Sequence, residues 1–263
     1  MGERNQRQLK ILERIRANNG ATISQLKNEF GVSVVTIRKD LEDLERDGLI
    51  VRKFGGAVPS QINDPLESFN VRAHLNHTEK QRIGKLAASL IEPMESVIID
   101  AGSTTLEIIR HLRHGMPLTI ITPALNIAIE ACTQPSINII VPGGGILDHF
   151  TLSLEGKDIE EQFSRLHADK LFLGVRGLDL QHGLTDTDSR RISLKQIMIR
   201  ASQQVIVVAD SRKIGRPSLI DIAPLSVVNA IVTDSGIDPA IAQELTNRGV
   251  RLCIAGEAQT PAQ

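Results

Sequence analysis

Five short polar segments follow apolar runs that are typical of buried strands, and their residue types suit an anionic, hydroxyl-rich ligand. These segments are residues 100–105, 122–126, 143–145, 174–177 and 210–215. Glycine lets a ligand approach the backbone, Ser and Thr offer hydroxyl donors, and a helix N-terminus directs free N–H groups at an anion. Because the carboxyl ends of parallel strands lie at one edge of a sheet, we expect these segments to meet in one crevice.

A helix that begins near Leu106 would place its N-terminus beside the first segment, and Lys195 and Lys213 would add positive charge. A single Gly-Ser-Thr loop is equally well explained as an ordinary helix cap, so the prediction depends on the recurrence of such loops at successive strand ends. The candidate ligand-binding residues are Asp100, Gly102, Ser103, Thr104, Thr105, Thr122, Gly144, Gly145, Gly174, Arg176, Lys195, Asp210, Ser211 and Lys213.

A second group of candidate residues lies near the N-terminus and suits contact with nucleic acid. Residues 1–58 carry 11 Lys and Arg against eight Asp and Glu, whereas residues 59–263 carry 19 against 23. Thr can contact a thymine methyl or a phosphate, Arg can read guanine through two hydrogen bonds, and Lys can bind phosphate. The candidate DNA-binding residues are Thr22, Ser33, Val35, Thr36, Arg38, Lys39, Arg52, Lys53, Gly55 and Gly56.

Helical periodicity predicts three short helices that would position this second group. The first is expected to end at residues 18–20, Thr22 to cap the second and Gly31 to end it, and Ser33 to cap the third. The expected inward-facing residues are Leu9, Leu12, Ile15, Ile23, Leu26, Phe30, Ile37, Leu41 and Leu44.

After residues 47–48, the stretches 49–54 and 55–58 fit two short strands with a glycine turn, which would place Arg52 and Lys53 for phosphates. Two helices joined by a Gly-containing turn and followed by such a hairpin form the plan of a winged helix-turn-helix. Periodicity alone leaves an alternative open, namely a small three-helix bundle whose charges are simply solvated.

The rest of the chain alternates short apolar runs with helical patterns, one of which Thr78 is expected to cap. This alternation predicts an α/β domain with a largely parallel sheet. The expected organisation is a DNA-binding domain at residues 1–58, a linker at 59–77 and a ligand-binding and oligomerisation domain at 78–257. The expected strands are residues 96–100, 118–122, 137–141, 170–174, 205–209, 228–232 and 251–254.

Both parts of the chain resemble the DeoR family of bacterial transcriptional regulators. Residues 33–41 and 44–57 resemble the family's winged helix-turn-helix, and this similarity extends over residues 3–58. It implies that residues 20–39 form the helix-turn-helix itself. The second resemblance rests on Phe69, Arg72, Glu79, Lys80, Ile83, residues 100–105, Gly144, Gly145, residues 172–174, Lys195 and residues 210–215.

The resemblance implies a sensor domain related in fold to ribose-5-phosphate isomerase, which binds a phosphorylated sugar or a similar metabolite and thereby weakens DNA binding. It further implies that a homodimer or homotetramer binds double-stranded operator DNA and represses a carbohydrate-utilisation operon. The chain looks most similar to regulators of sorbitol and amino-sugar use.

Three residues depart from the family's pattern in the sensor domain. Asp148 stands where many relatives have Arg, Arg176 where they have Asp, and Arg191 where they often have Glu. Arg176 and Arg191 could replace the missing anion partner. Alternatively, Arg176 pairs with Asp148 or another carboxylate and contacts no ligand.

Several classes of protein are disfavoured. The chain has no GxGxxG or GxxxxGK[ST] run, so no nucleotide cofactor is expected, and no other cofactor is indicated. Its two cysteines lack CxxC spacing and its paired histidines lack a third ligand, so no metal is expected. We expect a cytoplasmic protein that does not contact a membrane, because no apolar run is long enough for a span and no signal peptide is recognised.

Two alternative functions remain. The first is a sugar-phosphate isomerase with an accessory N-terminal module, in which Asp100, Asp210, Lys195 and Lys213 transfer protons. The resemblance disfavours this enzyme, and no catalytic residues are predicted. The second is a DNA-binding protein whose other domain only oligomerises.

Overall fold

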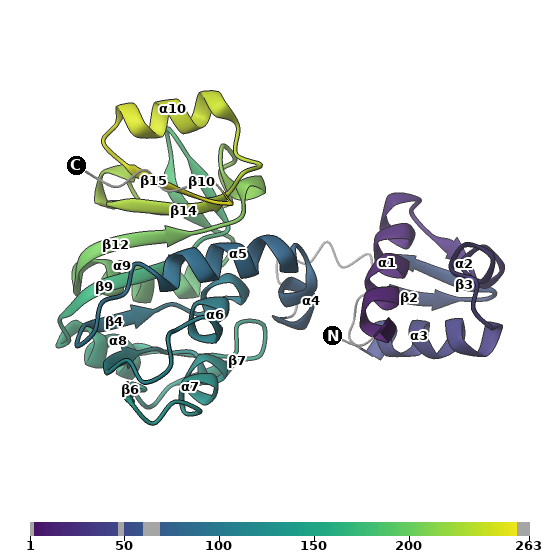
Figure 1. Ribbon diagram of the computed structural model, residues 1–263, viewed down its shortest axis with the longest axis horizontal. Coiled ribbons are helices and arrows are strands. Elements are labelled where there is room, and N and C mark those ends of the chain that lie inside the picture. Colours follow the sequence, from purple (N-terminus) through teal and green to yellow (C-terminus); the bar gives the residue numbers. More distant parts are fainter. Residues whose placement is uncertain (1–2, 47–49, 60–68, 257–263) are drawn as a thin grey trace. The chain divides into compact units, whose positions relative to one another are not determined.

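The computed structural model describes residues 3–46, 50–59 and 69–256, which form two compact units, Met1–Leu75 and Asn76–Gln263 (Figure 1). The turn predicted at residues 47–48 and most of the predicted linker, residues 60–68, lie outside the described residues. The described end of that predicted linker contains a short helix, α4 (Phe69–His74).

The first unit contains three helices and a small antiparallel sheet of order β1-β3-β2. The hairpin and the three helices confirm the predicted winged helix-turn-helix plan, whereas the pairing of β1 with β3 was not predicted. The elements are α1 (Glu3–Ala17), β1 (Ala21–Thr22), α2 (Ile23–Phe30), α3 (Val34–Arg46), β2 (Ile50–Lys53) and β3 (Gly56–Pro59).

The predicted caps of α2 and α3 are present. Thr22 and Gln25 form a capping box, in which the Thr22 hydroxyl accepts from the Gln25 N–H at 3.2 Å and the Gln25 side chain accepts from the Thr22 N–H at 2.8 Å. Gly31 ends α2 in the left-handed conformation, with a φ of 64°. The hydroxyl of Ser33 accepts from the Thr36 N–H at 3.1 Å, as a cap of α3 should.

The core of this unit contains most of the predicted apolar stripe of each helix together with one side of the hairpin. The side chain of Leu9, which was also predicted to face inward, lies outside the described part of the chain. Ile23 and Phe30 are only half-buried at its margin. The buried residues are Ile11, Leu12, Ile15, Ala21, Leu26, Ile37, Leu41, Leu44, Ile50 and Ala57.

The second unit is built on a seven-stranded sheet in which every neighbouring pair is parallel. Each of the seven predicted strands is present, in the order β15-β14-β12-β9-β4-β5-β6. The strands are β4 (Ser96–Ile99), β5 (Leu118–Ile121), β6 (Ile137–Ile140), β9 (Ala168–Gly174), β12 (Ser202–Val208), β14 (Ala230–Asp234) and β15 (Arg251–Ala255).

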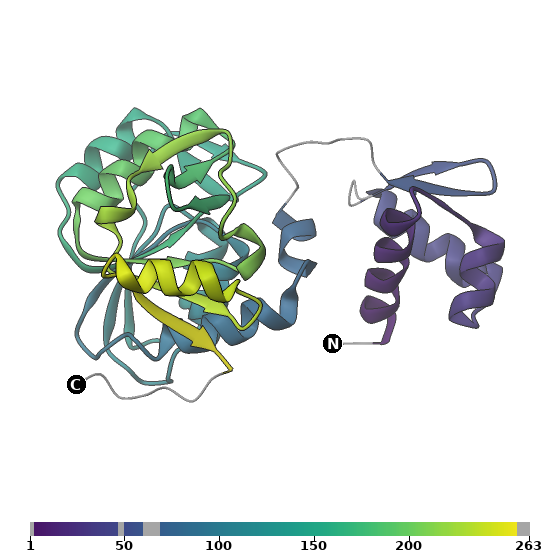
Figure 2. The same ribbon diagram turned by 90° about the horizontal axis from the view of Figure 1, so that it is seen from above.

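Helices cover both faces of this sheet (Figure 2): α5, α6 and α7 pack in one layer, and α8 and α9 pack together on the opposite face. The first of them, α5, is capped by Asn76, which has a φ of 52°, so the predicted cap at Thr78 is wrong. The helices of the unit are α5 (His77–Ala88), α6 (Ser103–Arg110), α7 (Leu125–Ala131), α8 (Lys157–Ser164), α9 (Ile192–Arg200) and α10 (Pro239–Asn247).

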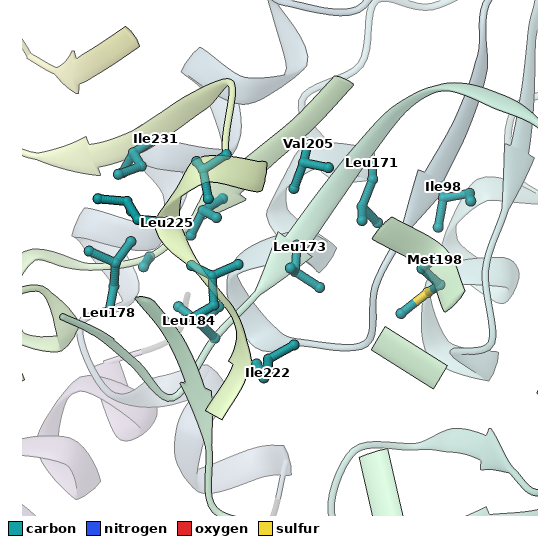
Figure 3. Packing of buried hydrophobic residues seen from close by; sticks show 14 of the residues in the cluster. Ile98, Leu171, Leu173, Leu178, Leu184, Met198, Val205, Ile222, Leu225 and Ile231 are labelled. Carbon is teal, nitrogen blue, oxygen red and sulfur yellow. The ribbon is translucent and has the colours of Figure 1, made fainter. Parts of the chain in front are cut away.

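Two small antiparallel sheets were not predicted. One is the hairpin of β7 (Ile146–Asp148) and β8 (Ser153–Glu155). The other joins β10 (Gly177–Asp179), β11 (Gly183–Asp186) and β13 (Ile220–Ala223). Figure 3 shows that side chains of this three-stranded sheet pack into the main core, so that the end of β11 is held firmly beside the large sheet.

None of the helices in the described ranges combines the length and the apolar character that crossing a membrane requires.

Candidate effector crevice and DNA-binding surface

The direction of strand succession reverses between β4 and β9. From β4 the chain continues to β5 and β6 on one side, whereas β9, β12, β14 and β15 extend the sheet on the other side. In open α/β sheets, ligands bind outside the carboxyl ends of the strands at such a switch point. The predicted ligand-binding segments 100–105 and 174–177 follow the two strands that flank it.

Asp100 links the carboxyl ends of β4 and β9 to α9 at the switch point. Its carboxylate accepts from the Ala101 N–H at 2.8 Å, from the Gly174 N–H at 3.2 Å and from the Lys195 amine at 2.9 Å. Lys195 also donates to the Gly174 carbonyl at 2.5 Å and lies 3.3 Å from a carboxylate oxygen of Asp186. Three of the predicted ligand-binding residues, Asp100, Gly174 and Lys195, therefore lie together, and their polar groups bond to one another.

The buried amine of Lys195 keeps its proton. Burial by itself lowers the pKa of a lysine, but Asp100 and Asp186 outweigh this effect and raise the pKa of Lys195 above its usual value. The charge of Lys195 is thus neutralised inside the protein, and the residue links the ends of β4 and β11 to α9.

The N-terminus of α6 offers further hydrogen-bond donors beside Asp100. The helix begins at Ser103, and its first N–H groups have no partner one turn earlier. Ser103 and Thr104 are only 7% and 4% exposed, and in the part of the chain that the structure describes no protein group bonds to either hydroxyl. Thr105 instead donates to the Gly102 carbonyl at 3.0 Å, and a Cβ on Gly102 would lie 2.9 Å from the Thr105 oxygen.

Thr122 serves the fold and has no hydroxyl donor left for a ligand. It is fully buried, donates to the Ile99 carbonyl at 2.7 Å and accepts from the Ala124 N–H at 3.1 Å. The β7–β8 hairpin lies against the loop that follows, because the Leu154 N–H donates to the Pro123 carbonyl at 2.9 Å.

The glycine loop after β6 is also built by close packing. Gly144 and Gly145 have φ values of 88° and 77°, which side chains rarely adopt. A Cβ on Gly145 would collide with the Glu155 carbonyl, so the loop can follow the hairpin only with glycine here.

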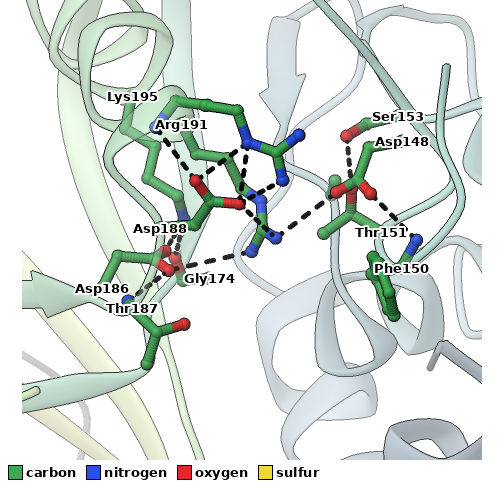
Figure 4. Close-up of polar contacts among 12 residues, drawn as sticks. Asp148, Phe150, Thr151, Ser153, Gly174, Asp186, Thr187, Asp188, Arg191 and Lys195 are labelled. Atoms are coloured by element: carbon green, nitrogen blue, oxygen red, sulfur yellow. Dashed lines mark hydrogen bonds and ion pairs between the residues drawn. The ribbon is translucent and has the colours of Figure 1, made fainter. Parts of the chain in front are cut away.

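Arg191 occupies the centre of a buried carboxylate cluster, which we call the Arg191 cluster (Figure 4). The guanidinium lies 3.3 Å from Asp148 and 3.2 Å from Glu155 on the β7–β8 hairpin. It lies 3.8 Å from Asp186 and 3.1 Å from Asp188, at and just beyond the end of β11. Arg191 is only 7% exposed, so this network joins the hairpin to the three-stranded sheet in a largely dry environment.

These contacts correct the prediction that Arg191 substitutes for a missing anion partner, because carboxylates already surround its guanidinium. The alternative in which Arg176 pairs with Asp148 or another carboxylate agrees with the influence of Arg176 on Asp186. Asp148 pairs with Arg191, whereas Arg176 helps to lower the pKa of Asp186.

The pKa values of two acids in the Arg191 cluster shift in opposite directions. Burial opposes ionisation of Asp186, but Lys195, the Thr187 N–H and Arg191 hold its pKa below the usual value. Burial and the neighbouring Asp148 instead raise the pKa of Glu155. Since Lys195 and Arg191 are paired with these acids, the N–H groups and hydroxyls at the start of α6 are candidate donors for an anion at this edge of the sheet.

The segment after β12 lies at the same edge of the sheet. The carboxylate of Asp210 accepts from Arg212 at 3.2 Å and from the Asn76 side chain at 3.3 Å. The Ser211 N–H donates to Asp234 at 2.8 Å, and residues 211–213 form a short 3-10 helix that includes Lys213. Asp210 and Ser211 thus anchor the loop that carries Lys213.

Three acids of the Arg191 cluster were not predicted from the sequence, namely Glu155, Asp186 and Asp188. Asp186 and Asp188 are two residues apart, and Ser189 separates them from Arg190 and Arg191. Such spacing places two acids on one face of an extended segment and could have marked them as partners of the arginines.

In the first unit, the start of α3 presents the predicted DNA-reading residues. Val35 is 73% exposed, and Arg38 and Lys39 are exposed on the same helix. The hydroxyls of Ser33 and Thr36 lie 2.8 Å apart and bond to each other at the cap. Arg38 and Lys39 are therefore the predicted residues of α3 that can reach base edges or phosphates with charge.

Arg52 and Gly56 have structural roles that the sequence did not predict. The Arg52 guanidinium lies 2.8 Å from Glu42 and 3.0 Å from Glu45, so its charge is balanced on α3 and its predicted role at phosphate is not supported. Gly56 is buried, and a Cβ there would collide with the Ala21 carbonyl. Lys53 is exposed, and Gly55 occupies the hairpin turn with a φ of 82°.

Comparison with known families agrees with both halves of this architecture. The DeoR-like helix-turn-helix domain matches residues 7–62, and the DeoR C terminal sensor domain matches residues 75–235. The chain belongs to the DeoR family. It is a DNA-binding transcriptional regulator, as the names of its DeoR-family relatives indicate, and the isomerase alternative is not favoured.

The similar DeoR-family proteins cover almost the whole chain. The transcriptional repressor GlcR of Bacillus subtilis is 32% identical over 95% of this chain and 95% of its own length. The transcriptional repressor AccR of Agrobacterium fabrum is 36% identical over 88% of this chain and 89% of its own length. The transcriptional regulator GolR of Listeria innocua is 32% identical over 95% of this chain and 98% of its own length.

Solved structures are more distant from this DeoR-family chain. A sor operon regulator from Shigella flexneri has a TM-score of 0.44 at 15% identity, over 61% of this chain and 86% of that one. Ribose 5-phosphate isomerase A from Methanocaldococcus jannaschii has a TM-score of 0.39 at 15% identity, over 53% of this chain and 55% of that one.

Proposed function

We propose that this DeoR-family regulator represses a carbohydrate-utilisation operon and leaves its operator when a phosphorylated sugar or related metabolite binds in the switch-point crevice. Residues 1–58 bind double-stranded operator DNA, residues 59–77 connect the domains, and residues 78–257 bind the effector and form a homodimer or homotetramer. Two of the relatives, GlcR and AccR, are named repressors, which supports the sign of regulation.

The proposal of an effector site rests on the first turn of α6. At the switch point, the first turn of α6 combines free N–H groups with the Ser103 and Thr104 hydroxyls, to which no described protein group bonds. A phosphate group accepts several such hydrogen bonds at once and is further stabilised by the helix dipole. The sugar hydroxyls would then extend toward the Arg191 cluster, whose carboxylates can accept hydrogen bonds.

Release from DNA follows if the effector favours one arrangement of the oligomer. The two recognition helices of a dimer must reach half-sites about 34 Å apart, or a multiple of that distance. A metabolite that binds more tightly to an arrangement with another spacing shifts the population toward it, and DNA affinity falls by the corresponding factor.

Arg38→Ala tests the assignment of α3 as the recognition helix. We expect the variant to lose about 10- to 100-fold in affinity for duplexes that the wild-type protein selects from a random pool, because one bidentate contact to guanine is removed. Binding is measured by fluorescence anisotropy of labelled DNA at fixed salt. Affinity for unselected duplex should change much less.

Lys39→Ala is the matched control on the same helix. Loss of a phosphate contact should weaken binding to all sequences alike and reduce the slope of log affinity against log salt by about 1. If the wild-type protein shows no preference for any duplex, the proposal fails, and if Arg38→Ala keeps full selectivity, α3 does not read the bases through Arg38.

A further inference from the structure

The turn of the β2–β3 hairpin carries an aromatic side chain that the fold does not use. Phe54 is 111% exposed, the highest value for a large hydrophobic side chain among the described residues, and it is the one aromatic residue in that exposed set. Burying a phenylalanine side chain stabilises a protein by about 1.5–3 kcal/mol, so a ring left in water contributes nothing to the stability of the fold.

The hairpin that carries the Phe54 ring is tied to both α3 and α2. Arg52, two residues earlier, is held by Glu42 and Glu45 of α3 at 2.8 and 3.0 Å. On the other side, the carbonyl of Gly55 accepts from the Ile23 N–H at 2.9 Å, which ties the turn to the start of α2. Figures 1 and 2 both show the turn on the side of the unit where α2 lies.

The surroundings of the ring identify the chemistry of its partner. Lys53 is exposed beside Phe54, and Arg38 and Val35 are exposed on α3, to which Arg52 fastens the hairpin. A cation next to an apolar ring suits a surface that offers phosphates around stacked bases. Because α3 takes the major groove, a hairpin fixed beside it can reach the neighbouring minor groove.

We propose that Phe54 inserts as an apolar wedge into the minor groove of the operator, between two base pairs, while Lys53 binds an adjacent phosphate. The inference rests on the proposed DNA-binding function and adds a source of sequence preference to it. Pyrimidine–purine steps unstack most easily, so operators should carry such a step at the contact of the hairpin turn. The inserted ring also bends the duplex away from the protein's minor-groove contact.

The test compares Phe54→Ala, Phe54→Trp and wild-type protein on duplexes that the wild-type protein has selected from a random pool. We expect Phe54→Ala to bind these duplexes about 10- to 100-fold more weakly, since loss of aromatic contact with bases has an effect of this order. Phe54→Trp retains a large ring and should bind close to the wild-type level. Fluorescence transfer between dyes at the two duplex ends measures the bend, which Phe54→Ala should lose.

Val51→Ala is the matched control, because Val51 is a partly exposed apolar residue of the same hairpin that lies away from the turn. It should bind and bend DNA like the wild-type protein. Thermal unfolding of Phe54→Ala should be unchanged, because the ring is outside the core.

The minor groove is tested separately with inosine in place of guanine at the contacted step. This replacement removes the guanine amino group from the minor groove and keeps the major-groove pattern, so it should change the affinity of the wild-type protein more than that of Phe54→Ala.

Phe54→Ala that binds and bends selected duplexes like the wild-type protein would overturn the wedge and leave the DNA-binding function standing. The wedge is also wrong if Phe54→Ala changes the size of the oligomer in sedimentation while DNA affinity is kept, because the ring would then contact a protein. A wild-type protein that selects no duplex would overturn both the wedge and the proposed function.

Discussion

Arg191→Met is expected to destabilise the second unit by about 3–5 kcal/mol, because removing one partner of a buried ionic network leaves the others uncompensated. The guanidinium is 7% exposed and contacts Asp148, Glu155 and Asp188 within 3.3 Å. Without it, several carboxylates would face one another away from water. Urea unfolding followed by circular dichroism is the suitable measurement, since the chain has neither Trp nor Tyr.

Arg165→Met is the control for this prediction. Arg165 pairs with Glu161 on the surface, where both side chains are well exposed, so the change should alter stability by less than about 1 kcal/mol. The loss of unfolding free energy in Arg191→Met, relative to the wild-type protein, should become smaller as the pH is lowered, because the carboxylates left without Arg191 then take up protons. Glu155, whose pKa is raised, should be protonated first. Equal stability of the two variants would show that the Arg191 cluster does not hold the hairpin in place.

Ser103→Asp is expected to abolish the response to a phosphorylated effector while DNA binding is retained. A carboxylate at the first position of α6 stabilises the helix itself but repels a phosphate and replaces a hydroxyl donor. Loss of a charged hydrogen bond together with this repulsion should raise the half-releasing concentration of the effector about 100-fold or more. The measurement is the release of labelled operator DNA as a sugar phosphate is added.

Asn247→Asp provides the matched control, because it adds the same charge at an exposed position on the last turn of α10. That turn leads into the first residue of β15, at the sheet edge opposite the crevice. Its response to the effector should be that of the wild-type protein. If Ser103→Asp is released from DNA at the wild-type effector concentration, the effector binds elsewhere.

The main elements could be predicted because each one has a strong local signal. The seven parallel strands are buried apolar runs, and Thr22 and Gly31 bound α2 by capping chemistry that depends on near neighbours. The small sheets were missed because a strand such as β7, with three residues, is too short to show a period. The cap at Asn76 was missed because a left-handed asparagine leaves no clear mark in the sequence.

The sequence predicted which loops form the candidate site, but it did not predict which charged side chains pair with one another there. Gly102, Ser103 and Thr104 could be placed at a strand end from residue type and strand order alone. Glu155 could not be recognised as a partner of Arg191, since it lies 36 residues earlier and reaches Arg191 only through the hairpin. Pairing of this kind decides which cations remain for a ligand, and it removes Arg191 from the expected anion contacts, whereas the start of α6 stays among them.

The most direct test of this account is a titration of labelled operator DNA and wild-type protein with pairs of metabolites, each sugar or polyol beside its own phosphate, at fixed salt. We expect one phosphate to lower the anisotropy to that of free DNA, whereas its unphosphorylated partner should have no effect at the same concentration. Release by a free sugar as effective as by its phosphate, or no release by any phosphate, would contradict an anion site at the N-terminus of α6.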